Sequence, residues 1–196
     1  MLKIAPVIID NWYSKEELNN VFSELDFYQK SASLKLAKDN CAYDENKIPK
    51  AKSFRLYPNN MWSREERRMS FIMRYQDKFK DTNLHKKIES VSNIYNQFKE
   101  TNYDTTIVSY YQNNDFYKSH NDLVKYTILI WVYKEPKQFT GGDLILTDLK
   151  KTIECKNNRL VLFPSFLFHE VTKIKSKKKI KDGYGRYCIT HFYNCI

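Results

Sequence analysis

Glycine and proline are scarce in this chain of 196 residues. Only 4 glycines and 5 prolines are present, and the first 140 residues contain no glycine. Stretches rich in Ser, Gly and Pro, which commonly separate domains, are therefore missing. Since the length also suits one domain, we expect residues 1–196 to form a single unit.

Long hydrophobic runs and paired cysteine motifs are missing too. The longest apolar run, residues 128–133, is far too short to span a bilayer. The N-terminus turns polar at Asp10 and Asn11 before it reaches the length of a signal peptide. The 4 cysteines, which include no C-x-x-C pair, are Cys41, Cys155, Cys188 and Cys195. We therefore expect reduced thiols in a cytoplasmic protein.

Aromatic and basic residues are plentiful. Hydrophobic residues make up 42% of the chain and include 12 Phe and 15 Tyr, which suffices for a core and argues against disorder. Lys and Arg exceed Asp and Glu by 33 − 23 = 10. This excess favours acidic partners, although a solvated lysine-rich surface is the simpler explanation.

Helix signals are concentrated in the first 100 residues. Residues 14–17 and 63–66 are capping boxes followed by apolar residues at helical spacing. A third helix is predicted from one apolar stripe, which contains Leu84, Ile88, Val91, Tyr95 and Phe98. The polar stretch at about 39–60 is expected to form a long loop or irregular strands. It is either a lid over a site or an ordinary surface loop.

From about residue 105 the pattern changes to short β-branched and aromatic segments separated by turn residues. Strands are predicted at residues 105–111, 126–133, 143–147, 150–155, 159–163, 170–174 and 185–193. Such a series is typical of a sandwich or jelly roll. We therefore expect an α+β, mainly β fold, with residues 1–100 as mostly helical support and 105–193 as the core. The lysine-rich run Lys173 to Lys181 is expected to be a hairpin tip.

One group of residues in the β-rich half suggests a metal site. His120 and Asp122 are two residues apart, so the end of one strand can present both to the same side. His169 must arrive from elsewhere, after the apolar residues 163–168. Two imidazoles and one carboxylate on one face of an octahedron are the ligands of non-haem iron(II) oxygenases. An isolated His-x-Asp is common by chance, so the combination carries this prediction.

A fixed cation follows in the last predicted strand. Arg186 has the same parity as Cys188 and Thr190, so its guanidinium is expected to face inward, where the strand offers no acid. Because an unpaired buried charge is very costly, we expect a bound carboxylate to meet it. His191 has the opposite parity and is expected to face away from the site.

The order of the motifs resembles the iron(II)- and 2-oxoglutarate-dependent prolyl-hydroxylase-like family. The matching segments are Tyr111, Tyr117-x-x-His120-x-Asp122, Gly141-Gly142-x-Leu144, Phe163-Pro-Ser165, His169-x-Val171 and Arg186-Tyr-x-Ile-Thr190. They cover about residues 105–193. Asn114 stands where the family often has a glycine, and asparagine tolerates the left-handed conformation better than most residues.

This resemblance implies a double-stranded β-helix, or jelly roll, with N-terminal supporting helices. It implies that His120, Asp122 and His169 hold iron(II), that Arg186 pairs with 2-oxoglutarate, and that dioxygen is the second cosubstrate. Ascorbate is an optional further cofactor. Further positions matched to the 2-oxoglutarate pocket are Tyr111, Thr190, Val171 and Trp131. The implied reaction couples decarboxylation of 2-oxoglutarate to hydroxylation of an unactivated C–H bond.

The substrate is left open among three hypotheses. A peptide or protein, with a prolyl residue as first choice, follows from the resemblance. A nucleic acid that is oxidatively demethylated would suit the net charge, but Cys188 and Phe192 replace the Asn and second Arg that the dealkylating branch typically has. A non-catalytic basic β-barrel that binds an acidic partner is the third. No membrane partner is expected, and the oligomeric state is not predicted.

Overall fold

Two antiparallel β-sheets form most of the structure. The computed structural model describes residues 4–37 and 41–196. The strands of the larger sheet are β1 (Val7–Asp10), β2 (Lys35–Leu36), β4 (Phe54–Leu56), β5 (Tyr103–Tyr111), β7 (Tyr126–Val132), β10 (Arg159–Pro164) and β12 (Arg186–Asn194). Those of the smaller sheet are β3 (Ala51–Lys52), β6 (Phe116–His120), β8 (Leu144–Leu146), β9 (Lys151–Ile153) and β11 (His169–Val171).

The strand order confirms the predicted jelly roll. The seven-stranded sheet has the order β1-β10-β7-β12-β5-β4-β2, and the five-stranded sheet has the order β3-β6-β11-β8-β9. Each of the predicted segments from residue 105 onward contains a strand, with ends shifted by a few residues. β6 was not predicted, because its middle residues Lys118 and Ser119 lack an apolar alternation.

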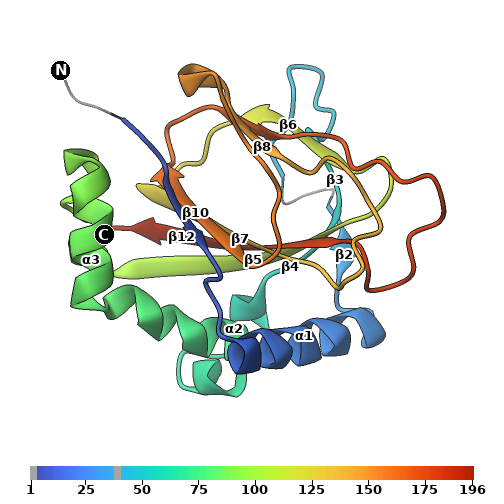
Figure 1. Ribbon diagram of the computed structural model, residues 1–196, viewed down its shortest axis with the longest axis horizontal. Coiled ribbons are helices and arrows are strands. Elements are labelled where there is room, and N and C mark those ends of the chain that lie inside the picture. The colour runs from blue at the N-terminus through green and yellow to red at the C-terminus, as the bar shows by residue number, and fades with distance from the viewer. Residues whose placement is uncertain (1–3, 38–40) are drawn as a thin grey trace.

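Helices cover one face of the larger sheet. The α-helices are α1 (Lys15–Lys30), α2 (Phe71–Arg74) and α3 (Thr82–Val91). The short 3-10 helices are η1 (Pro58–Asn60), η2 (Glu66–Met69), η3 (Tyr75–Lys80), η4 (Asn93–Tyr95), η5 (Phe98–Glu100) and η6 (Thr147–Leu149). Figure 1 shows α1 and α2 beneath the strands and α3 beside their end. Among these helices, none is long and apolar enough to cross a membrane.

The predicted first helix is confirmed together with its capping box. The Ser14 backbone N–H donates to the Glu17 carboxylate at 2.8 Å, and the Glu17 N–H donates to the Ser14 hydroxyl at 3.2 Å. Both bonds satisfy backbone donors that a helix start leaves free. The buried face of α1 includes Val21 and Leu25, which pack against the larger sheet.

The other two predicted helices are broken. Ser63 and Glu66 make the expected reciprocal bonds, but Ser70 is extended and caps a separate short helix, α2. α3 ends at Val91 because Ser92 is extended, with φ −165° and ψ 139°. Serine side chains that bond to the backbone compete with helix continuation, which is why the apolar stripe continues through 3-10 turns instead.

Residues 1–100 were expected to be mostly helical support, yet they also supply β1 to β4. Three of these strands join the larger sheet and β3 joins the smaller one. β1 pairs with β10, so that Val7 lies opposite Leu162. The N-terminal part therefore extends both sheets as well as covering one of them.

The larger sheet has two different buried faces. One face packs against the helices through residues such as Ile130 and Ile189, and the other packs against the smaller sheet through Trp131 and Phe163. Full burial of an aliphatic or aromatic side chain contributes roughly 1.5–3 kcal/mol, so both layers stabilise the sheet. Alternation along each strand decides which residues reach which layer.

The lysine-rich run is not a hairpin tip, as had been expected. β11 and β12, which flank it, belong to different sheets, so residues 172–185 cross from one sheet to the other. Lys175 forms an isolated antiparallel bridge with Thr140. The local pattern of lysines predicted exposure correctly but contained no information on which sheet each flanking strand would join.

Candidate metal and cosubstrate site

Three side chains from two separate parts of the chain converge between the sheets. His120 ends β6, Asp122 follows it, and His169 begins β11. One ligand atom from each lies within 4.8 Å of the others. The Asp122 carboxylate oxygens lie 3.8 Å from His120 Nε2 and 3.5 Å from His169 Nε2. These three atoms can occupy neighbouring positions around one ion.

Strand pairing explains this convergence. β6 and β11 are adjacent and antiparallel, with His120 directly opposite His169. Asp122 lies just beyond the strand end, and its backbone N–H donates to the Ser165 carbonyl at 3.0 Å. The expectation that one strand end would present both His120 and Asp122 is therefore correct only for His120, since a turn positions the aspartate.

Both histidines are oriented with Nε2 toward the shared point. His120 Nδ1 lies 2.9 Å from the Lys118 carbonyl, and His169 Nδ1 lies 2.9 Å from the Leu167 carbonyl. A carbonyl can only accept, so each Nδ1 carries the proton and each Nε2 presents a lone pair. Such partners are typical of metal-binding histidines. Burial, followed by the proximity of His169, lowers the pKa of His120 to about 3, so that imidazole is neutral, as a metal ligand must be.

The aspartate is held by a hydroxyl pair that was not predicted. Thr127 Oγ1 donates to Asp122 Oδ2 at 2.6 Å and lies 2.8 Å from Ser165 Oγ. Both hydroxyl residues are fully buried, with exposed fractions of 0%. The hydrogen bond from Thr127 fixes the carboxylate rotamer, with Oδ1 toward His120 and Oδ2 toward His169.

Arg186 lies deep between the sheets, as its parity predicted. It is 0% exposed, and none of its three guanidinium nitrogens has a hydrogen-bond acceptor among the described residues. Its Cζ lies 4.9 Å from the Tyr111 ring centroid and 5.4 Å from that of Trp131. Burial raises the pKa of the nearby Cys155 thiol, so the sulfur does not provide the missing negative charge. A bound carboxylate would provide that negative charge.

The neighbouring turn explains why glycine is present here. Gly142 has φ +76°, and a Cβ at this position would lie 2.7 Å from Arg186 Cδ and 2.6 Å from Ile174 Cδ1. Any side chain would displace the arginine. The Gly141-Gly142 pair therefore allows the chain to pass directly against the buried cation. Asn114 has φ 68°, in agreement with its predicted left-handed conformation.

A pocket of about 340 Å³ opens beside the three converging residues. Its lining includes three positions predicted for the cosubstrate, namely Tyr111, Val171 and Thr190. Trp131 is 0% exposed, and its indole Nε1 lacks a hydrogen-bond partner in the described part of the chain. Arg186 and Trp131 are absent from the pocket lining, so they lie behind its wall, next to Tyr111.

Sequence reasoning missed a further pocket residue. Arg55 comes from β4, inside the stretch that was expected to be a loop, and is only 5% exposed. Its guanidinium lies 4.6 Å from the Tyr117 ring, which stacks on His120 at 3.6 Å and 17°. The Tyr117 ring therefore supports His120 from one side. The 39–60 stretch forms part of the pocket wall rather than a simple surface loop; its residues 39 and 40 lie outside the described residues.

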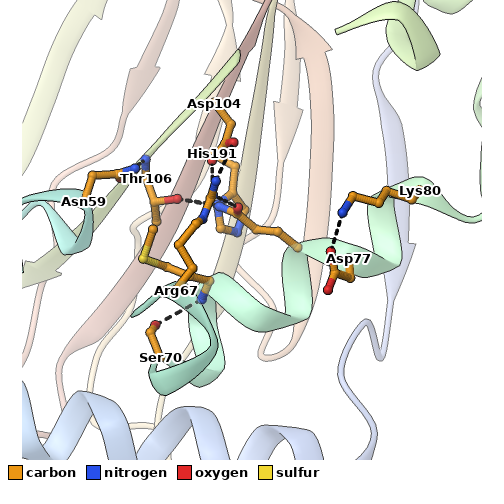
Figure 2. Close-up of polar contacts among 10 residues, drawn as sticks. Asn59, Arg67, Ser70, Asp77, Lys80, Asp104, Thr106 and His191 are labelled. Atoms are coloured by element: carbon orange, nitrogen blue, oxygen red, sulfur yellow. Dashed lines mark hydrogen bonds and ion pairs between the residues drawn. The ribbon is translucent and has the colours of Figure 1, made fainter. Parts of the chain in front are cut away.

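Other histidines have structural surroundings. His191 is 1% exposed and faces the helices, as predicted from its parity. Its Nδ1 lies 2.6 Å from Gln76 Nε2 and 3.0 Å from Thr106 Oγ1, and Figure 2 shows His191 beside Thr106 and Arg67. His85 Nε2 lies 2.6 Å from the Phe79 carbonyl, and the His85 ring contacts Phe98.

A jelly roll with this arrangement is typical of the non-haem iron(II), 2-oxoglutarate-dependent oxygenases. The two imidazoles and single carboxylate suit iron(II), and the buried guanidinium that lacks an acceptor suits the far end of a dicarboxylate. The residues therefore fit both groups that this class binds.

Comparison with known proteins identifies the same class. Residues 106–194 match the family model of the 2OG-Fe(II) oxygenase superfamily. This part of the chain therefore matches a 2OG-Fe(II) oxygenase domain, and members of that class use iron(II), 2-oxoglutarate and dioxygen. No curated protein sequence matches the chain significantly.

Solved structures share the fold at low sequence identity. A Pseudomonas putida prolyl-4-hydroxylase aligns with TM-score 0.61 and 11% identity, over 99% of this chain and 94% of that one. A Trichoplax adhaerens prolyl hydroxylase, in complex with a hypoxia inducible factor peptide fragment, aligns with TM-score 0.62 and 17% identity, over 96% of this chain and 83% of that one. The viral collagen prolyl hydroxylase of Paramecium bursaria Chlorella virus-1 aligns with TM-score 0.56 and 14% identity, over 96% of this chain and 94% of that one.

Proposed function

We propose that this oxygenase hydroxylates an unactivated C–H bond of a peptide or protein, with a prolyl residue as the first substrate to test. The observation that carries this proposal is the convergence of His120, Asp122 and His169 at the edge of a pocket. That arrangement gives one ion three protein ligands on one side and leaves its other side toward the pocket.

The roles of the site residues follow from their contacts. Two histidine Nε2 atoms and one Asp122 oxygen hold iron(II), and the Thr127 hydroxyl keeps the carboxylate oriented. Arg186 pairs with the distal carboxylate of 2-oxoglutarate, with a further hydrogen bond from the Trp131 indole, since both have unsatisfied buried donors. Tyr111, Thr190 and Val171 line the space between these ends.

The protein contributes to the reaction by positioning the bound groups and by excluding water. Iron(II) with 2-oxoglutarate supplies the activation of dioxygen. Leu129, Val171 and Cys188 make much of the pocket wall apolar, which excludes water from a reactive site. Neutral His120 and the hydrogen-bonded Asp122 keep the ligand set at a single negative charge, which leaves the iron site cationic and favours an anionic cosubstrate.

The rim of the pocket supports a polypeptide substrate. Leu123 lines the pocket and is 95% exposed. Phe166 and Phe168, on the segment leading to His169, are 52% and 46% exposed. Exposed apolar groups of this kind are typical of interaction sites. The inner wall also carries Cys188 and Phe192, rather than the amide and guanidinium typical of the nucleic-acid dealkylating branch. The Trichoplax relative, solved with a peptide, supports the same choice.

The test is turnover with a peptide panel. Purified protein with iron(II), 2-oxoglutarate and proline-containing peptides should form succinate, and one peptide should gain the mass of one oxygen atom. Peptides with alanine in place of proline serve as the matched control. Succinate formation that no peptide stimulates, combined with demethylation of methylated bases, would replace this proposal with the nucleic-acid alternative.

A further inference from the structure

A second cavity lies on the opposite face of the larger sheet from the metal pocket. It has a volume of about 660 Å³ and is formed by η2, α2, η3, η5 and the ends of β5 and β12. This volume lies within the range of small-molecule sites. The two cavities share no lining residue, so a ligand in the second one would be separated from the metal pocket by the sheet.

Positive charge dominates the second cavity. Its charged lining residues are the cations Arg64, Arg67, Arg68, Arg74, Lys80 and Lys99 and the anions Glu65, Asp77 and Asp104. The difference is 6 − 3 = +3. Two anions are already paired, Asp104 with Arg67 and Asp77 with Lys80 at 2.6 Å, as Figure 2 shows. In the described structure no carboxylate pairs with Arg64, Arg68 or Arg74.

The floor of this cavity is rigidly hydrogen-bonded. Arg67 donates to both Asp104 oxygens and to Gln76 Oε1. The Gln76 amide nitrogen in turn contacts Thr106 Oγ1 and His191 Nδ1. Gln76 is 7% exposed and His191 is 1% exposed. Because these bonds hold Arg67 and Asp104 to each other, Asp104 is not available to neutralise the arginines at the rim.

Aromatic rings accompany the arginines. Tyr103 lines the cavity and is 50% exposed. Deeper in the cavity lie Tyr193, Phe98 and His85, of which Phe98 contacts both others edge to face. Arginine binds phosphate oxygens through a planar fork of donors, and exposed aromatic rings stack on nucleic-acid bases. The lining combines both kinds of group.

We propose that this cavity binds a nucleotide unit, with the phosphate on Arg64, Arg68 and Arg74 and the base stacked on Tyr103. A free mononucleotide and a nucleotide within a single strand of nucleic acid both present this chemistry. The ligand is not the oxygenase substrate, because the sheet separates it from His120 and Asp122. The proposal therefore does not depend on the function proposed above.

The lysine-rich crossing segment offers a matched control. Lys137, Lys175, Lys177, Lys178, Lys179 and Lys181 line another hollow, which has no acidic residue in its lining. Its aromatic residue, Phe139, is 5% exposed and cannot serve as a stacking platform. This surface has at least as much positive charge as the arginine cavity but lacks both the guanidinium forks and the exposed ring.

The experiment measures binding of the full-length protein to three probes, which are AMP, a fluorescent single-stranded oligonucleotide and inorganic phosphate. The variant R64Q/R68Q/R74Q should weaken binding of the best probe at least about tenfold. For the oligonucleotide, the slope of log binding constant against log salt concentration should become shallower by about 2. The variant K177Q/K178Q/K179Q loses the same charge and should change binding less than about threefold. All of the substituted side chains are exposed, so both variants should fold, which circular dichroism checks.

A ring substitution tests the second half of the proposal. Tyr103→Leu should weaken nucleotide binding about tenfold, whereas Tyr103→Phe should retain it. AMP binding as tight as oligonucleotide binding would identify a free nucleotide, and binding of the oligonucleotide alone would identify a strand. Equal weakening by the two triple variants, binding of phosphate as tightly as AMP, or no binding of any probe would overturn the proposal.

Discussion

The two faces of the larger sheet bury polar groups in opposite ways. On the side toward the smaller sheet, whose strands carry His120 and His169, each of these histidines uses Nδ1 in a hydrogen bond and directs Nε2 at a shared point. On the face toward the helices, His191 contacts Gln76 and Thr106, and Gln76 in turn accepts from Arg67. The first group is complete only with a ligand, whereas the second is completed by the protein.

Buried polar groups that need a ligand mark a functional site, whereas buried polar groups that the protein itself satisfies mark a structural network. An unsatisfied buried donor costs about 1–3 kcal/mol, and Arg186 and Trp131 both contribute such donors behind the metal pocket. A bound cosubstrate would remove that cost, so it would stabilise the folded state. Arg67 has its acceptors already, and the network around it gains no such stabilisation from 2-oxoglutarate.

The largest expected effect is the loss of a metal ligand. His120→Ala should lower succinate formation by about 10³-fold or more, because two ligands hold iron(II) poorly and metal activation is worth several kcal/mol. Anaerobic iron titration and succinate detection measure both quantities. Glu170→Ala is the control, since Glu170 neighbours His169 but is not one of the converging residues. Full turnover by His120→Ala would show that the convergence has no catalytic role.

Arg186 should govern affinity for 2-oxoglutarate. Arg186→Gln is expected to raise the KM for 2-oxoglutarate about 100-fold, because a buried charge pair is lost. Without cosubstrate, its free energy of unfolding should not fall, since an unpaired buried charge is removed.

Arg67→Gln is the counterpart on the other face. It should leave this KM unchanged while lowering the free energy of unfolding by about 1–3 kcal/mol. Steady-state kinetics with urea unfolding distinguishes the two variants. The reverse pattern would contradict the comparison between the faces.

Two threonines provide a closer test. Thr127→Val removes the hydroxyl that holds Asp122 and should weaken iron(II) binding about 10- to 100-fold. Thr106→Val removes a hydroxyl beside His191 and should lower stability by about 1 kcal/mol without affecting iron affinity. Anaerobic titration of both variants provides the measurement. Equal loss of iron affinity would mean that the two networks are coupled through the sheet.

The smallest effect is the pH dependence that His191 contributes to stability. Burial, together with the nearby Arg67, lowers the pKa of His191 to about 3, below its unfolded value of roughly 6.5. Folding therefore releases a proton from the imidazolium below pH 6.5, and stability falls as the pH drops from there toward 3. Above pH 6.5 this contribution is constant.

Between pH 7 and 5.5 the loss from this one group should be about 1 kcal/mol. His191→Phe lacks the titrating group, so urea unfolding should show a weaker pH dependence in the variant by that amount. Identical pH dependence of the two proteins would show that His191 is not held in its neutral form.

Much of the site could be predicted because its signals are local. Parity along one strand placed Arg186 inward and His191 outward, and both directions agree with their burial and contacts. The glycine pair belongs to the matched motif, and φ +76° at Gly142 shows a conformation that favours glycine. These predictions needed only the alternation of a strand and the conformational freedom of glycine.

The missed features depend on partners that are distant in the sequence. Thr127 resembles any β-branched strand residue until Ser165 and Asp122 are brought beside it. Arg55 lies in a polar stretch with no strand pattern, yet pairing of β4 with β5 carries it into the pocket. The lysine run was assigned to a hairpin because its sequence does not reveal that β11 and β12 join different sheets.

The sequence by itself determined the class of chemistry, since the identity and order of two histidines, an aspartate and an arginine define which ion and which anion can bind. It also determined the β-rich half, because alternation and β-branched residues act over a few neighbours. Only the tertiary structure decided that His120 faces His169, that Thr127 holds Asp122, and that arginines surround a second cavity. Those outcomes depend on strand pairing between residues far apart in the chain, and the free energy of that pairing belongs to the whole packed sheet rather than to any local segment.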